Sequence, residues 1–282
     1  MLNARASRGG SRPDRAIALA ARLPKPAKRA VRRALAARWV QACMGRSAAG
    51  RRLLDSIPPP AVGCVDMGDL RRTTPIASDF GYGRGGPVDR YYIELFLAEH
   101  SADIRGRVLE IGDDAYTRRF GGVYVARADV LHVEADSGAA FIGDLTDAAL
   151  LPPDTFDCIV LTQTLHLIFE PAVALRNIRR ALAPGGVLLL TVPGISNVDP
   201  GRWGSTWFYS FTEHAVARMC DEAFNGFDVK IESHGNVLAA TAFLHGLAAS
   251  ELNRAELDAH HPEYSVIHTA RVRKQLDDSE TS

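Results

Sequence analysis

Two acidic residues at the ends of predicted strands, Glu110 and Glu134, have the spacing of a site for a nucleotide-like cofactor. Residues 107–112 read RVLEIG, a short apolar run that predicts a buried strand followed by a sharp turn. Gly112 lets the backbone approach a ligand closely. Glu134 ends a second predicted strand 22 residues later, where a carboxylate can accept hydrogen bonds from both hydroxyls of a ribose. The alternatives are a simple strand-end turn and a solvated loop acid.

Strand and helix patterns alternate from residue 87 onward. After Pro87, apolar residues at helical spacing predict an amphipathic helix, namely Val88, Tyr91, Tyr92, Leu95 and Phe96. Further helices are predicted from Pro171 and after Thr212. Strands are predicted at 107–111, 130–133, 140–143, 156–161, 187–192, 229–232 and 265–268. Strands joined by helices imply a doubly wound α/β fold with a mostly parallel sheet, whose carboxyl edge binds ligands.

Five short segments, taken in their order, resemble the methyltransferase type 11 group of class I S-adenosylmethionine (SAM) dependent methyltransferases. They are RVLEIGDD at 107–114, FD at 156–157, LHLI at 165–168, LAPGG at 182–186 and WFYSFTE at 207–213. The resemblance covers about residues 87–274. It implies a Rossmann-like, seven-stranded sheet with the last strand inserted antiparallel beside the fifth. Of the family motif Glu/Asp-x-Gly-x-Gly-x-Gly only the first glycine is kept, and Asp114 and Tyr116 replace the next two.

The resemblance implies SAM as the cofactor. Glu134 is then expected to bind the ribose, and Asp144 the adenine amino group unless it caps the following turn. Asp114 is expected either to crowd the amino-acid tail of SAM or to pair with its ammonium group, with Thr117 nearby. A solvated helix N-terminus is the alternative for Asp113 and Asp114. The expected cofactor site comprises Glu110, Gly112, Asp114, Thr117, Glu134, Asp144, Leu145 and Thr162.

The acceptor is expected to bind beyond the fourth strand. A hydroxyl acceptor benefits from a general base, and His166 is the candidate catalytic residue, although a lone histidine is more often structural. Gln163, Trp207 and Tyr209 are expected to contact the substrate, unless the aromatic residues belong to the core. The fourth strand lacks the Asn/Asp-Pro-Pro-Tyr/Phe motif of methyltransferases that modify amide or base nitrogens. This favours transfer to a hydroxyl oxygen of a small molecule or glycan.

The net charge of zero conceals a strong asymmetry. Residues 1–52 carry fourteen Lys/Arg and one acid, whereas the remainder carries nineteen bases and thirty-two acids. Val31, Leu35, Trp39 and Cys43 recur every four residues among these bases, which predicts a short basic amphipathic helix. Such an arm could bind an anionic membrane surface, nucleic acid or the acidic remainder of the chain. A transit peptide or a simple solvated arm are the other interpretations, and no specific nucleic-acid binding is expected.

These patterns divide the chain into four parts. We expect a basic, partly helical or disordered arm at 1–58, a Gly/Pro-containing linker at 59–86, the methyltransferase-like domain at 87–274 and an acidic tail at 275–282. No apolar run approaches the roughly 20 residues that span a bilayer. The four cysteines are scattered, which predicts neither a disulfide framework nor a metal site. A cytoplasmic protein, peripheral at the membrane through its arm, is expected.

Three functional hypotheses follow from the sequence. The first is SAM-dependent methyl transfer to a small molecule or glycan. The second is a methyltransferase fold that has lost turnover and binds a ligand or partner, because the later glycines of the motif are absent. The third, an α/β domain that uses another nucleotide, such as a dehydrogenase, is disfavoured because no complete Gly-x-Gly-x-x-Gly follows a strand.

Overall fold

The computed structural model describes residues 59–199, 201 and 203–276, which belong to two compact units. The described part of the smaller unit is 59–72 and 253–256, and that of the larger unit is 73–199, 201, 203–252 and 257–276. In the smaller unit, the Asn253 amide donates to Glu256 Oε2 (2.9 Å), and the Glu256 amide donates to Asn253 Oδ1 (3.1 Å). The predicted basic arm lies outside the described residues, as does most of the acidic tail.

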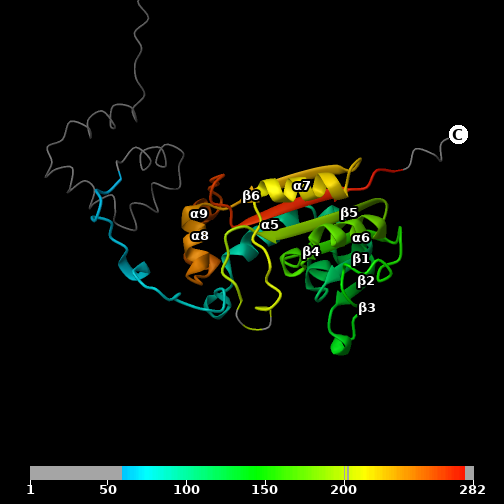
Figure 1. The fold of residues 1–282 in the computed structure, drawn as a ribbon, viewed down its shortest axis with the longest axis horizontal. Coiled ribbons are helices and arrows are strands. Elements are labelled where there is room, and N and C mark those ends of the chain that lie inside the picture. Colours follow the sequence, from blue (N-terminus) through cyan, green and yellow to red (C-terminus); the bar gives the residue numbers. More distant parts are fainter. Residues whose placement is uncertain (1–58, 200, 202, 277–282) are drawn as a thin grey trace, which may run out of the picture. The chain divides into compact units, whose positions relative to one another are not determined.

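The larger unit is built on a seven-stranded sheet (Figure 1). Its strands are β1 (Gly106–Ile111), β2 (Val125–His132), β3 (Phe141–Ile142), β4 (Phe156–Thr162), β5 (Leu182–Pro193), β6 (Asp228–His234) and β7 (Ile267–Arg273). Their order is β3-β2-β1-β4-β5-β7-β6. Strand β7 runs antiparallel to β5 and β6, and all other neighbours are parallel. The Rossmann-like sheet, with its last strand antiparallel beside the fifth, is thereby confirmed.

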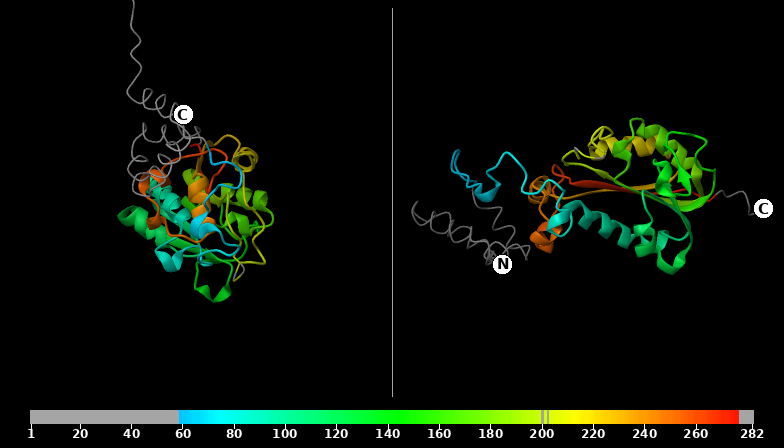
Figure 2. Two further views of the ribbon diagram at one scale, coloured as in Figure 1. Left: turned by 90° about the vertical axis from the view of Figure 1, so that its left-hand side faces the viewer. Right: turned by 90° about the horizontal axis from the view of Figure 1, so that it is seen from below.

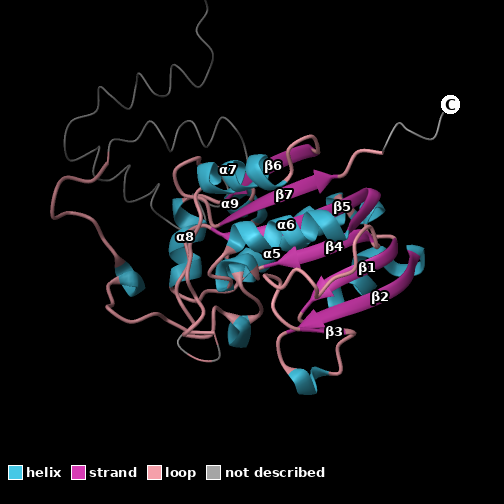
Figure 3. Cartoon of the chain, turned by 45° about the vertical axis from the view of Figure 1, so that its right-hand side comes forward, coloured by secondary structure: helices cyan, strands magenta, loops and turns pink. Residues whose placement is uncertain are grey.

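Helices cover both faces of this sheet (Figures 2 and 3). One face packs against α5 (Val88–Glu99) and α8 (Val237–Leu244), and the other against α6 (Pro171–Ala181) and α7 (Glu213–Ala223). The short α9 is Arg254–Leu257. Single-turn helices lie at Gly68–Leu70, Tyr82–Arg84, Ser101–Asp103, Thr117–Gly121, Gly122–Tyr124, Ala135–Ser137, Leu165–Leu167 and Ala249–Glu251. None of the described helices combines the length and apolar composition needed to cross a membrane.

Strand β4 shows how the sequence specifies a doubly covered sheet. Ile159 and Leu161 point into the core under α6 and α7, whereas Cys158 and Val160 point into the core under α5 and α8. All four are fully buried, because successive side chains of a strand alternate between its faces. A strand with two covered faces therefore reads as a continuous apolar run.

Helix α5 forms where the sequence predicts it but buries a different stripe of residues. Pro87 precedes its first turn, and Val88, Tyr92, Ile93, Phe96 and Leu97 are buried. The prediction that Leu95 belongs to the buried face is wrong, because its side chain is 43 % exposed. Positions 88, 92, 93, 96 and 97 also have helical spacing. The buried stripe of α5 is thus rotated about the helix axis relative to the predicted one. Asp89 and Arg90, in the first turn, lie toward the carboxyl edge of the sheet.

Candidate active site

A cavity of about 1110 Å³ lies at the carboxyl ends of β1, β2 and β4. The direction of chain progression reverses between β1 and β4, which is the usual ligand position in an open α/β sheet. The predicted cofactor residues that line it are Glu110, Gly112, Asp144, Leu145 and Thr162. The predicted acceptor residues that line it are Gln163, His166 and Trp207. The other four predicted residues, Asp114, Thr117, Glu134 and Tyr209, are not among its lining.

The side chain of Glu110 organises the turn after β1. This buried carboxylate accepts hydrogen bonds from the backbone amides of Tyr116 (3.2 Å) and Thr117 (2.7 Å). Burial raises the pKa of Glu110, although these amides favour its ionised form. Gly112 has φ +94°, and a Cβ there would meet open space, so the backbone itself borders the cavity. Glu110 thus fixes the shape of the loop in which two glycines of the expected motif are replaced.

The acids that replace or precede the missing glycines are engaged within the loop. Asp113 Oδ1 accepts a hydrogen bond from the Ala115 amide (2.8 Å). Asp114 forms an ion pair with Arg118, one helical turn further along, at 2.6 Å. Its side chain lies outside the cavity lining. The aspartate at the second glycine position therefore leaves the cavity unobstructed.

The edge of the site beyond β2 and β3 contains further predicted residues. Asp144 lines the cavity and also accepts the Thr146 amide at 2.8 Å, so it caps its own turn. Next to it, Leu145 contributes a buried apolar side chain. His132 and Val133 line the cavity at the end of β2. Glu134 is exposed and follows them directly, so its role toward a ribose stays a prediction.

Arg90 is the main site residue that sequence reasoning missed. Its guanidinium lines the cavity from α5 and donates to the hydroxyls of Tyr116 (2.8 Å) and Tyr82 (3.3 Å). Within the described chain it forms no ion pair with a carboxylate. A half-buried cation with only phenol oxygens as partners fits an anionic ligand group. The sequence gives little signal for it, because Arg90 stands beside Asp89 in the first turn of α5, where charged residues are common.

Backbone strain is concentrated at this cavity. Of the described non-glycine residues, only Phe80 (φ 58°), Asp154 (φ 48°) and Gln163 (φ 45°) have left-handed backbone conformations. Phe80 and Gln163 both line the cavity. Gln163 follows β4 and is held by a hydrogen bond from its amide to the Thr191 carbonyl (3.0 Å). Such conformations cost about 1–3 kcal/mol each and gather at functional sites.

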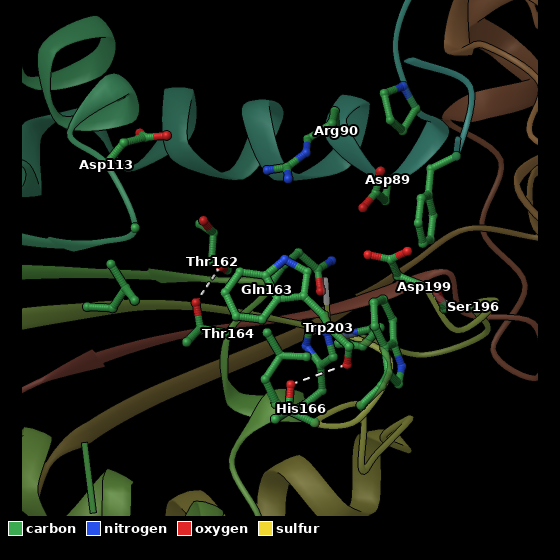
Figure 4. Close-up of a pocket in the computed structure, with 18 of the residues that line it drawn as sticks. Asp89, Arg90, Asp113, Thr162, Gln163, Thr164, His166, Ser196, Asp199 and Trp203 are labelled. Atoms are coloured by element: carbon green, nitrogen blue, oxygen red, sulfur yellow. Dashed lines mark hydrogen bonds between the residues drawn. The ribbon is translucent and has the colours of Figure 1, made fainter. Parts of the chain in front are cut away.

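Aromatic rings form the wall opposite α5 (Figure 4). Trp207 stacks on Phe80 at 6.0 Å between ring centroids and contacts the His166 ring at 4.4 Å. Trp203 also lines the cavity. Tyr209, in contrast, packs against the core and donates its hydroxyl proton to the Phe169 carbonyl at 2.8 Å. Of the two aromatic residues predicted to contact the substrate, Trp207 therefore lines the cavity and Tyr209 does not.

His166 is electrostatically unusual for a histidine. It is 2 % exposed, and its Nδ1 has no hydrogen-bond partner among the described residues. Burial lowers the pKa of His166 to about 4. The imidazole is therefore neutral at pH 7, which is the form that accepts a hydrogen bond from a hydroxyl.

We expect the buried His166 to make the fold sensitive to acid. Because its pKa is lower in the folded than in the unfolded state, its contribution is complete above about pH 6.5 and is lost as the pH falls toward 4. Between pH 6.5 and pH 4, the free energy of unfolding of the native protein should therefore decrease by about 3 kcal/mol more than that of His166→Phe. Urea unfolding at several pH values measures this difference. The exposed-site variant His214→Phe should retain the native slope, and an unchanged slope in His166→Phe would contradict the assignment.

The sequence matches a family model for a methyltransferase domain over residues 79–229. A SAM-dependent methyltransferase from Archaeoglobus fulgidus is a structural neighbour, with 12% identity, coverage of 66% of this chain and 94% of that chain, and a TM-score of 0.45. For a SAM-dependent methyltransferase from Mesorhizobium loti these values are 18%, 67%, 99% and 0.45. For the [4+2]-cyclase SpnF they are 19%, 66%, 81% and 0.46. No curated protein matches the sequence.

Proposed function

Because the family match covers more than half of the sequence, the chain belongs to the methyltransferase domain family, and we propose that it methylates a hydroxyl oxygen of a small molecule or glycan. Its cofactor is SAM, a sulfonium compound that supplies an activated methyl group when bound. One observation supports the proposal best: the same cavity is lined by predicted cofactor residues and by a neutral histidine and two indoles. No element of the site resembles the motif used for amide or base nitrogens.

Three features of the cavity fit SAM. The open backbone at Gly112 leaves room for the amino-acid tail. Arg90 offers a guanidinium to the carboxylate of that tail. Asp144 and Leu145 border the place where the adenine is expected. The volume exceeds the roughly 300–1,000 Å³ of an ordinary ligand pocket, so an acceptor can be held beside the cofactor.

The chain's own residues would act mainly by positioning the acceptor. Holding two reactants in line can supply several kcal/mol of barrier reduction, because their relative motion is already restricted. We assign to His166 the acceptance of a hydrogen bond from the reacting hydroxyl. With a pKa of about 4, the imidazole is too weak a base to retain the proton, which then passes to solvent. Gln163 and Trp207 would hold the acceptor on either side.

Incubation of the full chain with methyl-labelled SAM and a library of small hydroxyl compounds and glycans tests this proposal. The expected product is a labelled methyl ether, accompanied by an equal amount of S-adenosylhomocysteine. Label found on nitrogen or carbon would overturn the choice of a hydroxyl acceptor. The variant His166→Phe should bind SAM normally and show a reduced turnover rate.

The basic arm is proposed to bind an anionic membrane surface. Its few apolar positions give weak binding alone, whereas each basic residue near anionic lipid adds roughly 1 kcal/mol that salt screens. We expect the full chain to sediment with phosphatidylserine vesicles at low salt, and deletion of residues 1–52 to abolish this while leaving SAM binding intact. A truncated protein with a much lower melting temperature, together with no vesicle binding by the full chain, would favour packing of the arm on the acidic remainder.

A further inference from the structure

The end of the cavity farthest from the Gly112 loop combines two carboxylates with aromatic rings. In Figure 4, Asp113 lies at one end of the cavity, and Asp89 and Asp199 lie at the other, with Arg90 between them. Asp89 enters from the first turn of α5, and Asp199 from the loop that follows β5. Their carboxylates point toward one another across the cavity. If the cofactor occupies the Gly112 end, the acceptor meets these two acids.

Asp89 differs from the other acids of the cavity in how its carboxylate is satisfied. Asp79, Glu110, Asp113 and Asp144 each accept backbone amides, and Glu94 pairs with Arg119. Asp199 likewise accepts one amide, from Gly201 at 2.9 Å. Asp89 Oδ1 is closed off from solvent and has no hydrogen-bond partner among the described residues. Neither Asp89 nor Asp199 forms an ion pair within the described ranges.

A second and independent observation comes from the aromatic wall. His166 is 2 % exposed, and its Nδ1 is unpartnered within the described chain, as is the buried Nε1 of Trp207. Phe80 and Trp207 stack with an interplanar angle of 13°. Trp203 lines the same end of the cavity. Aromatic faces attract cations, and most strongly where water is excluded.

We propose that this end of the cavity binds the acceptor through a cationic group, so that the substrate is a small hydroxyl compound carrying an ammonium group. The ammonium lies between the carboxylates of Asp89 and Asp199, beside the indoles of Trp203 and Trp207. The inference rests on the proposed function and narrows its acceptor class, since a neutral glycan would add no positive charge beside the two acids.

Electrostatics support this choice of ligand. An ionised carboxylate taken out of water needs a charged partner or several hydrogen bonds. Burial raises the pKa of Asp89, and the neighbouring Arg90 only partly opposes this. An ammonium group would donate to both carboxylates and restore the ionised form. A neutral hydroxyl compound could donate a hydrogen bond but would bring no positive charge to stabilise the ionised form of Asp89.

Binding of matched probes to the full chain saturated with S-adenosylhomocysteine tests the proposal. The probes are tyramine with its neutral analogue 4-propylphenol, and choline with its neutral analogue 3,3-dimethyl-1-butanol. Calorimetry and tryptophan fluorescence report binding. At least one cation should bind about tenfold or more tightly than its analogue, a difference of about 1.4 kcal/mol. Asp199→Asn and Asp89→Asn should each remove most of this preference, whereas Asp113→Asn, at the cofactor end, should retain it.

The outcomes separate this proposal from the proposed function. Equal affinities within both pairs of probes, or no binding of either cation, would overturn the proposed cation site. The cofactor site would still be supported in that case, provided that S-adenosylhomocysteine saturates the protein. Weaker S-adenosylhomocysteine binding by Asp199→Asn, with cation binding unchanged, would also overturn it and assign the acid to the cofactor. Failure of S-adenosylhomocysteine to saturate the native protein would overturn the proposed function itself.

Discussion

Replacement of Arg90 by alanine should weaken the binding of SAM and S-adenosylhomocysteine about 10- to 150-fold. The guanidinium lines the cavity and has only the hydroxyls of Tyr82 and Tyr116 as hydrogen-bond acceptors among the described residues. A carboxylate bound there would gain charge-assisted hydrogen bonds of about 1.5–3 kcal/mol. Titration calorimetry with both ligands measures the loss.

Two further variants make the Arg90 experiment specific. Arg118→Ala removes an exposed guanidinium that pairs with Asp114, and it should leave cofactor affinity within about twofold of the native value because exposed pairs contribute little. Arg90→Lys should recover part of the affinity, since lysine keeps the charge but lacks the planar fork of donors. Native affinity in Arg90→Ala, with an unchanged melting temperature, would remove Arg90 from the cofactor site.

Replacement of Glu110 by alanine should lower the free energy of unfolding by about 2–3 kcal/mol and weaken SAM binding. The substitution leaves the amides of Tyr116 and Thr117 without their acceptor, and a buried amide without a partner costs about 1–3 kcal/mol. The loop after β1 then loses the shape that opens Gly112 to the cavity. Urea unfolding gives the stability, and calorimetry gives the affinity.

Asp113→Ala is the matched control for Glu110→Ala. It also removes a carboxylate that accepts an amide in this loop, from Ala115, but the residue is exposed and water can replace the bond. We therefore expect a loss well below 1 kcal/mol, as for other exposed substitutions. Equal losses in the two variants would contradict the role of Glu110 as the residue that organises the turn.

The strand pattern and the resemblance together predict the fold well, because buried strands and the helices between them leave local signals. Glu110, near the end of β1, and Gly112, directly after the strand, both line the cavity. Which side chains of α5 are buried was harder to predict. Leu95 and Leu97 both suit an amphipathic helix, and only packing against the sheet decides that Leu97 is buried.

The same limit explains the site residues that the sequence does not reveal. Asp89 and Arg90 reach the cavity only because the N-terminal half of α5 lies beside the carboxyl edge of a sheet whose strands come later in the chain. Asp199 belongs to a loop without a periodic pattern. Asp114 shows the converse, since its carboxylate pairs with Arg118 four residues later, a spacing that can be read from the sequence alone.

Titration calorimetry of the full chain with SAM, S-adenosylhomocysteine and NAD tests most directly whether the cavity beside Gly112 is a SAM site. We expect one molecule of SAM or S-adenosylhomocysteine to bind per chain, in competition with each other, and NAD not to bind. The absence of saturable binding by both SAM and S-adenosylhomocysteine, or saturable binding of NAD in their place, would contradict the account.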